Sequence, residues 1–255
     1  MKLSVIICCY NEKATIQEVI HQTQAVDLGP GWDREILVVD NFSTDGTREI
    51  LQQIADPEIR IFFHERNMGK GMSIRTGIEN MTGDYMIIQD ADKEYDPAEH
   101  ARFCRKVEET GAAAIFGSRI LGGRAIYEYA HAYWGIRTLT AMTNILFGGH
   151  LTDVGTATKM VRADVVKSLN LTTTDFNLDF ELPDKILLAG YEILEIPISY
   201  DPRTYAEGKK ITVKDGLRAM LTMLRDRLGV TAVLKSDVKP QAHNKVVTSQ
   251  ANLRD

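Results

Sequence analysis

Three acidic side chains, spaced one residue apart, follow a short apolar run in the first half of the chain. Asp90, Asp92 and Glu94 come after Tyr85–Ile88, whose length and β-prone residues predict a buried strand. Ligands of an open α/β sheet bind at the carboxyl ends of its strands, so these carboxylates are expected beside a ligand. Carboxylates suit Mg²⁺ or Mn²⁺, which can also hold a diphosphate. We therefore predict a metal site at Asp90, Asp92 and Glu94, with a solvated acidic turn as the plainer alternative.

Polar pairs also follow two other predicted strands. The pairs are Tyr10 with Glu12, and Asp40 with Asn41. Because parallel strands end at the same edge of a sheet, we expect these pairs to lie near the acidic loop. The set resembles a nucleotide site, with an aromatic ring for the base and acids for base, ribose and a diphosphate-bound metal. Lys70, between two glycines, could approach a phosphate, although Gly-Lys-Gly lacks the spacing of a P-loop.

The elements that must position these residues alternate between strand and helix patterns. Apolar runs predict strands at residues 3–9, 35–39, 59–64, 85–88, 112–117, 158–161 and 191–200. Helical spacing of apolar residues fills most of the intervals, for example over residues 16–23, 50–54, 127–147 and 175–188. This alternation with short connections predicts an α/β fold, a doubly wound and largely parallel sheet flanked by helices.

Bulk composition narrows the classes of function. The 255 residues carry a net charge of −5, which argues against a nucleic-acid-binding protein. The three cysteines form neither a disulfide framework nor a metal-ligand spacing. No run approaches the roughly 18 apolar residues of a membrane span, and the N-terminal run is too short for a signal peptide. We expect a cytoplasmic protein with one domain over residues 1–234 and a polar, disordered tail over residues 235–255.

Two segments could contact a membrane. An amphipathic helix is predicted at about residues 212–229, where Leu217, Leu221 and Leu228 form an apolar stripe among basic residues. The aromatic-rich segment 127–147 is either a core helix or a surface that touches lipid. Packing on their own domain is the alternative for both, and peripheral contact with the cytoplasmic face of a membrane is the sharper hypothesis.

The order of motifs resembles that of a family 2 glycosyltransferase with the GT-A fold, and most closely the dolichyl-phosphate mannosyltransferase branch. The motifs that carry the resemblance are Cys8-Cys9-Tyr10-Asn11-Glu12, Val39-Asp40-Asn41-Phe42-Ser43-Thr44-Asp45-Gly46-Thr47, Asn67-x-Gly69-Lys70-Gly71, Asp90-Ala91-Asp92, Gly117-Ser118-Arg119 and Arg203…Gly208-Lys209. They span roughly residues 3–230. Cys8 stands where the family has proline, and Asn41 where it has a second aspartate, which leaves the donor base open.

The resemblance implies a role for each matching residue. Nucleotide-sugar binding is implied for Cys8, Tyr10, Glu12, Asp40, Asn41, Lys70, Asp90, Ala91 and Asp92, and metal binding for Asp90, Asp92 and Glu94. Catalytic roles are implied for Asp92, Arg119, Arg203 and Lys209. The implied cofactor is Mg²⁺ or Mn²⁺, and the implied reaction is inverting transfer of a hexose, such as mannose from GDP-mannose, to a polyprenyl or dolichyl phosphate.

The nature of the acceptor separates the competing hypotheses. A lipid phosphate is already anionic at neutral pH, so it needs cations that hold two phosphates in line rather than a strong base. A soluble saccharide or protein hydroxyl would need a carboxylate base, for which Asp153 and Glu181 are candidates. A third hypothesis is a non-catalytic nucleotide-sugar-binding subunit of a membrane complex.

Overall fold

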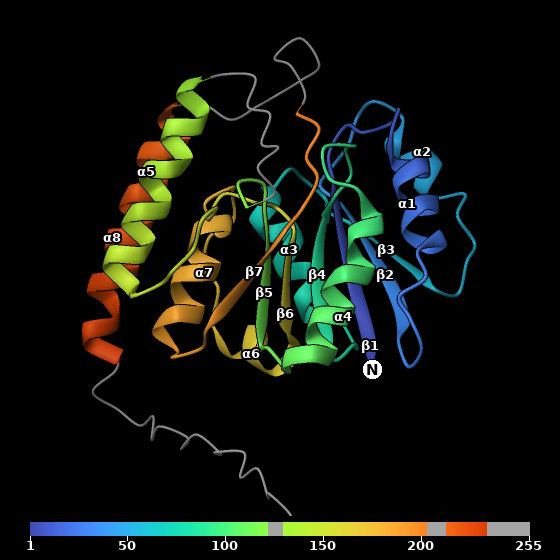
Figure 1. Ribbon diagram of the computed structural model, residues 1–255. Coiled ribbons are helices and arrows are strands. Elements are labelled where there is room, and N and C mark those ends of the chain that lie inside the picture. The colour runs from blue at the N-terminus through green and yellow to red at the C-terminus, as the bar shows by residue number, and fades with distance from the viewer. Residues whose placement is uncertain (122–129, 203–212, 234–255) are drawn as a thin grey trace, which may run out of the picture.

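One seven-stranded sheet forms the centre of the molecule (Figure 1). The computed structural model describes residues 1–121, 130–202 and 213–233. The strand order is β3-β2-β1-β4-β6-β5-β7. The strands are β1 (Lys2–Cys9), β2 (Asp33–Asp40), β3 (Ile59–Phe63), β4 (Tyr85–Asp90), β5 (Ala114–Ser118), β6 (Lys159–Arg162) and β7 (Ile193–Pro197). Of these strands only β6 runs against the others, so the mostly parallel sheet confirms the predicted fold class.

Helices cover both faces of the sheet, which is why β1 is apolar at nearly every position. Successive side chains of a strand point to opposite faces. Val5 and Ile7 therefore pack with α1 (Ile16–Ala25) and α4 (His100–Thr110), whereas Ile6 packs on the other face. The helices that pack on that face are α3 (Lys70–Asn80), α6 (Ala163–Ser168) and α7 (Leu178–Leu188). The remaining short helices are α2 (Thr47–Leu51) and η1 (Pro97–Glu99).

Several element boundaries differ from the sequence prediction. Strand β4 continues through Asp90, so this carboxylate belongs to the last residue of the strand rather than to the loop. Helix α6 was not predicted, because its six residues are too few for a helical period to stand out. The helix expected from residue 175 begins at Leu178, because Asp175 accepts a hydrogen bond from the backbone N–H of Asn177 and closes a turn there.

Two long helices form an outer layer beside the sheet. Helices α5 (Ala130–Phe147) and α8 (Val213–Val233) lie side by side (Figure 1) and share a small apolar cluster that includes Leu139, Val154 and Met223. The expected start of the first helix, residues 127–129, lies outside the described residues. Across the ranges that the structure describes, no helix is long and apolar enough to cross a membrane.

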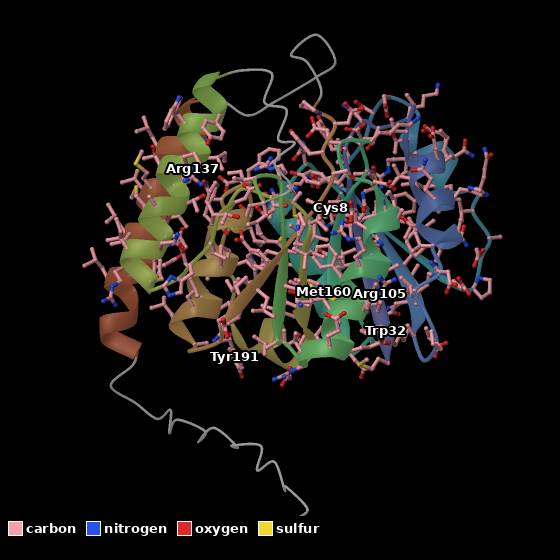
Figure 2. The ribbon with its side chains drawn as sticks, viewed as in Figure 1. Cys8, Trp32, Arg105, Arg137, Met160 and Tyr191 are labelled. Atoms are coloured by element: carbon pink, nitrogen blue, oxygen red, sulfur yellow. The ribbon has the colours of Figure 1, made fainter. Side chains whose placement is uncertain are left out.

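The two ends of the sheet differ in chemistry. Cys8 lies toward the end of the sheet where the parallel strands finish, whereas Trp32 lies at the opposite end (Figure 2). Trp32 is buried with Tyr85 in a tilted aromatic contact and is part of the core. The polar residues predicted to bind a ligand gather instead at the end that carries Cys8.

Candidate active site

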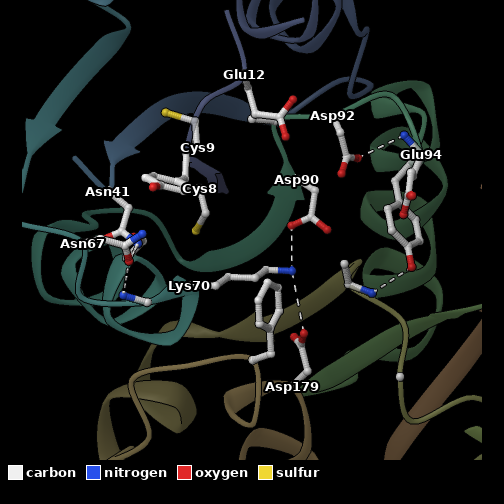
Figure 3. A pocket seen from close by; sticks show the side chains of 18 of the residues that line it. Cys8, Cys9, Glu12, Asn41, Asn67, Lys70, Asp90, Asp92, Glu94 and Asp179 are labelled. Atoms are coloured by element: carbon white, nitrogen blue, oxygen red, sulfur yellow. Dashed lines mark hydrogen bonds and ion pairs between the residues drawn. The ribbon is translucent and has the colours of Figure 1, made fainter. Parts of the chain in front are cut away.

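A cavity of about 280 Å³ opens at the carboxyl ends of the central strands (Figure 3). It brings together most of the residues predicted from the sequence to bind a ligand. The predicted residues that line it are Cys8, Tyr10, Glu12, Asn41, Lys70, Asp90, Ala91, Asp92, Glu94 and Arg119. The clustering follows from the parallel registers of β1 with β2 and β4, which set Cys9 beside Asp40 and Cys8 beside Asp90.

Asp40 lies beneath this cavity rather than on its wall. Its side chain is fully buried, accepts hydrogen bonds from the backbone N–H of Ser43, and pairs with Arg48 at 3.4 Å. These contacts hold the loop after β2 in place. The predicted contact of Asp40 with a nucleoside therefore stays a prediction, and the observed contacts are structural.

Lys70 joins two carboxylates across the cavity. Its Nζ lies 2.7 Å from Oδ1 of Asp90 and 3.7 Å from Oδ2 of Asp179 (Figure 3). Burial alone would lower the pKa of Lys70, but the charges of Asp179 and Asp90 outweigh burial and raise it well above its ordinary value. Lys70 is therefore a fixed cation in the cavity.

The glycines that flank Lys70 explain its position. A Cβ on Gly69 would lie 2.3 Å from the carbonyl oxygen of Thr174, and one on Gly71 would lie 2.7 Å from that of Asp175. Gly69 also has a φ of +89°, which a residue with a side chain rarely adopts. The start of α3 can thus lie directly against the segment that precedes α7, and this contact places Lys70 opposite Asp179.

A second lysine lies behind Asp179. Lys159, on β6, is completely buried, donates to the backbone carbonyl of Asp179 at 2.8 Å, and lies 3.6 Å from its carboxylate. Burial lowers the pKa of Lys159 to about 8, although Asp179 opposes the shift. Asp179 is thus held between two lysines.

The acidic residues after β4 do not form a ready metal centre. Asp92 accepts a hydrogen bond from the backbone N–H of Glu94 at 3.1 Å, and the Glu94 carboxylate accepts one from the hydroxyl of Tyr200 at 3.2 Å. Within the described residues, no group of three metal-ligating side chains is close enough to hold an ion. Glu94 turns toward Tyr200 and Asp90 pairs with Lys70, so the metal site expected at Asp90, Asp92 and Glu94 stays a prediction.

Arg119 is oriented by a buried carboxylate. Its Nε and Nη2 donate to the two oxygens of Asp153, each at 2.7 Å, and its Nη1 donates to the Tyr95 hydroxyl at 3.2 Å. The side chain of Asp153 is fully buried. Asp153 therefore orients Arg119 and is not available as a general base.

Glu181, the other candidate base, is also excluded by its surroundings. It is fully buried, accepts hydrogen bonds from Thr172 and Thr173, and pairs with Lys185 at 2.8 Å. Burial would raise its pKa, but the hydrogen bonds from Lys185 and the two threonines lower the pKa to about 2. Glu181 anchors the segment before α7, and it does not line the cavity.

Several residues that line the cavity were not predicted as site residues. They include Asn67, Tyr95, Phe176, Asp179 and Tyr200. Asp179 is acidic in the first turn of α7, where sequence reasoning assigns such a residue to the helix dipole. Asn67 begins the motif Asn67-x-Gly69-Lys70-Gly71, and its place in that motif is the sequence signal for it. Two predicted residues, Arg203 and Lys209, lie outside the described residues.

Comparison with known proteins agrees with this architecture. TarS from S. aureus, residues 1–349, crystallised with UDP-GlcNAc, has a TM-score of 0.59 and 16% identity, and the match covers 94% of this chain and 68% of TarS. Glucosyl-3-phosphoglycerate synthase from Mycobacterium tuberculosis, crystallised with Mg²⁺ and UDP, has a TM-score of 0.63 and 19% identity, covering 89% of this chain and 79% of that one. A second structure of that synthase contains Mn²⁺, UDP and phosphoglyceric acid, with a TM-score of 0.63, 19% identity, and coverage of 89% and 78%.

The sequence also matches a family model across its first two thirds. The matching model is Glycosyl transferase family 2, over residues 4–169. That range runs from β1 to α6 and contains Asp90, Asp92 and Arg119. The chain therefore belongs to glycosyl transferase family 2.

Proposed function

We propose that this protein transfers a hexose, with inversion, from a nucleotide-sugar to a polyprenyl phosphate and that the reaction depends on Mg²⁺ or Mn²⁺. One observation carries the proposal: a single cavity holds the carboxylates Asp90 and Asp92 together with the cations Lys70 and Arg119. Breaking a sugar–diphosphate bond places negative charge on the leaving group, so catalysis requires cations close to it. GDP-mannose is the first donor to test.

The carboxylates fit a metal that binds together with its substrate. Mg²⁺ is usually bound by one or two carboxylates plus substrate phosphates, so a cage of three protein ligands is not required. Asp92 and Asp90 would hold the ion, with Lys70 as the competing cation at Asp90. When bound, the ion would stabilise the departing diphosphate.

The contacts of the buried acids favour an acceptor that is already anionic. Asp153 is paired with Arg119 and Glu181 is outside the cavity, so neither is suited to deprotonate a hydroxyl. Arg119 lines the cavity and is proposed to face a phosphate, together with Arg203 and Lys209. A lipid phosphate needs these cations more than it needs a base.

The outer helices support a lipid-linked acceptor. Their exposed large apolar side chains include Trp134 and Ile145 on α5, and Leu217, Leu221 and Leu228 on α8. The acidic side chain in residues 216–229, Asp226, is buried, whereas Arg218, Arg225 and Arg227 are exposed. An apolar face rimmed by arginine suits contact with an anionic membrane surface.

A soluble hydroxyl acceptor is the second candidate, because Asp179 also lines the cavity. Its carboxylate could accept a proton, as the alternative hypothesis requires. The Asp179 carboxylate is already paired with Lys70 and Lys159, and both contacts compete with any role in taking a proton from the acceptor. The phosphate acceptor is therefore the stronger proposal.

A transfer assay tests the proposal. Nucleotide-sugars are first ranked with Mn²⁺ by the rise in melting temperature, and the best donor is then supplied with polyprenyl phosphate or with the matching polyprenol. We expect product from the phosphate alone, and we expect Asp92→Asn to lower kcat/KM by about 10²-fold or more. Asp33→Asn, an exposed aspartate on another part of the sheet, is the control.

Each other outcome rejects a defined part of the proposal. Product from the polyprenol or a soluble sugar alone would favour the hydroxyl acceptor. Tight donor binding without turnover on any acceptor would favour the non-catalytic subunit. Full activity of Asp92→Asn would show that the reaction does not depend on a metal held by Asp92.

A further inference from the structure

Two asparagine side chains form one end of the cavity. Nδ2 of Asn41 donates to Oδ1 of Asn67 at 2.9 Å, and both residues line the cavity (Figure 3). The charged residues Asp92 and Glu94 lie toward the other side, with Lys70 between (Figure 3). The cavity therefore has a neutral amide end and a charged end.

Backbone N–H groups fix the orientation of both amides. The N–H of Met68 donates to Oδ1 of Asn41 at 2.8 Å, and the N–H of Gly69 donates to Oδ1 of Asn67 at 3.1 Å. A backbone N–H can only donate, so the atom that it meets must be the amide oxygen. Neither amide can flip without bringing two donors together.

His64 completes the hydrogen bonding of the Asn41 oxygen. Nδ1 of His64 lies 3.1 Å from Oδ1 of Asn41, and its Nε2 lies 3.0 Å from the hydroxyl of Thr76. The amide oxygen cannot donate, so Nδ1 carries the proton and Nε2 accepts from Thr76. Oδ1 of Asn41 then accepts two hydrogen bonds within the protein, which uses its full capacity.

Only donors are left on the two asparagine side chains. Asn41 has one N–H beyond the one that it gives to Asn67, and Asn67 has two. In the described part of the chain, no acceptor lies within hydrogen-bond distance of these three N–H groups. A ligand that pairs with these two amides must therefore offer acceptors.

We infer that Asn41 and Asn67 select the base of the donor, and that they favour a base with two neighbouring acceptor atoms over uracil. The inference rests on the proposed function, in which the charged end of the cavity takes the diphosphate and the neutral end takes the base. O6 and N7 of guanine form such a pair, as do O2 and N3 of cytosine. Uracil presents N3–H between its two oxygens, and this donor would face other donors.

An aspartate at position 41 of this chain would accept where Asn41 donates. A carboxylate accepts but does not donate, so it suits the N3–H of uracil. A donor that the bound ligand shields from water and leaves unpaired lowers affinity, and sites built around hydrogen bonds discriminate strongly against a ligand that leaves one unmade. We therefore expect wild-type protein to bind GDP or CDP at least about tenfold more tightly than UDP.

The test is a calorimetric binding panel of GDP, CDP, UDP and ADP with Mn²⁺. Asn41→Asp should lower the preference for GDP or CDP over UDP by about tenfold or more, because the new side chain accepts hydrogen bonds where Asn41 donates them. Asn170→Asp is the matched control, since it makes the same change at an exposed residue outside the cavity. Asn67→Ala, at an exposed position, should also reduce the preference and serves if Asn41→Asp does not fold.

The outcomes separate this inference from the proposed function. GDP alone or CDP alone above UDP supports the inference and identifies the base. The inference is overturned if UDP binds as tightly as GDP and CDP, or if both variants keep the wild-type ranking of nucleotide affinities. Either result is still consistent with a nucleotide-sugar donor. Failure of all four nucleotides to bind overturns both.

Discussion

The arginine and aspartate that meet at the cavity show how one residue can determine the geometry of another. Asp153 offers both oxygens to Arg119 and also accepts from the Arg119 backbone N–H at 3.0 Å. Arg119 keeps Nη1 on the Tyr95 hydroxyl, and its guanidinium lies 5.0 Å from the ring centre of Tyr200. A guanidinium held this firmly loses little entropy when it contacts a phosphate.

Removing the charge of Asp153 should destabilise the fold strongly. Asp153→Asn leaves a buried guanidinium without its counter-ion, and we expect a loss of about 3–5 kcal/mol in the free energy of unfolding. Urea denaturation measures the change. Asp164→Asn is the matched control, because Asp164 also pairs with an arginine through both oxygens but is 65% exposed. The control should lose less than about 1 kcal/mol, and equal losses in both variants would contradict the role given to burial.

At the scale of elements, α7 connects the cavity to the outer helices. Its first turn carries Asp179 into the cavity, and its next turns carry Asp184 toward α5 and α8. Asp184 is fully buried and accepts a hydrogen bond from Thr143 of α5 at 3.3 Å. Burial raises the pKa of Asp184 to about 8, and the nearby charge of Asp226 on α8 adds to the shift.

The contact between these helices should weaken as the pH rises. The unfolded chain releases the proton of Asp184 near the ordinary aspartate pKa, about 3.9, whereas the folded chain keeps it until about pH 8. The stability that protonated Asp184 contributes is therefore complete below the unfolded pKa of about 3.9 and is lost as the pH rises through the folded pKa of about 8. Between these two values the free energy of unfolding falls by about 1.4 kcal/mol per pH unit. Lys159 and Glu181 also face Asp184 and have opposite effects on it.

Asp184→Asn tests this pH dependence. The variant cannot lose the proton, so its melting temperature should exceed that of the wild type above pH 8 and differ less near pH 5. The exposed variant Asp33→Asn should show no such crossover. Parallel curves for Asp184→Asn and the wild type would show that Asp184 is ionised throughout.

At the scale of the whole molecule, charge and apolar surface are unevenly distributed. The chain has a net charge of −5, yet the exposed charged side chains of residues 133–147 on α5 and 216–229 on α8 are arginines, including Arg137. Figure 2 shows Arg137 on α5, away from the sheet. This layer also carries six of the ten exposed large hydrophobic side chains in the described chain. Segregation of this kind favours one binding face.

We expect the α5–α8 layer to bind vesicles that contain anionic lipid. The double variant Leu221→Gln with Leu228→Gln removes two side chains that are 67% and 72% exposed, so folding should be little affected. Vesicle partitioning, measured by sedimentation, should fall roughly tenfold or more, and added salt should weaken it further. Leu121→Gln, at a 48% exposed leucine outside the layer, is the control. Equal partitioning of the wild type, the double variant and Leu121→Gln would exclude the α5–α8 layer as the membrane-binding face.

The sequence by itself determined the α/β alternation, the strand ends that line the cavity, and the family. These features are local: a strand of apolar residues, a turn of polar ones and a motif of fixed spacing each lie within about ten residues. The sequence did not determine that β6 runs antiparallel, because alternation predicts a strand but not its direction. The sequence also left Glu181 and Asp153 as possible bases, because it does not show whether an acidic side chain is paired in the folded protein.

Tertiary contacts between distant segments decided the rest of the site. Lys70 meets Asp179 across 109 positions of sequence, and Asn41 meets Asn67 through a turn that follows another strand. Which acids are paired, which lysines are fixed and which amide atoms face the cavity all depend on these contacts. Burial makes such pairings strong and leaves each buried polar group few alternatives, so packing decides the chemistry that composition and spacing leave open.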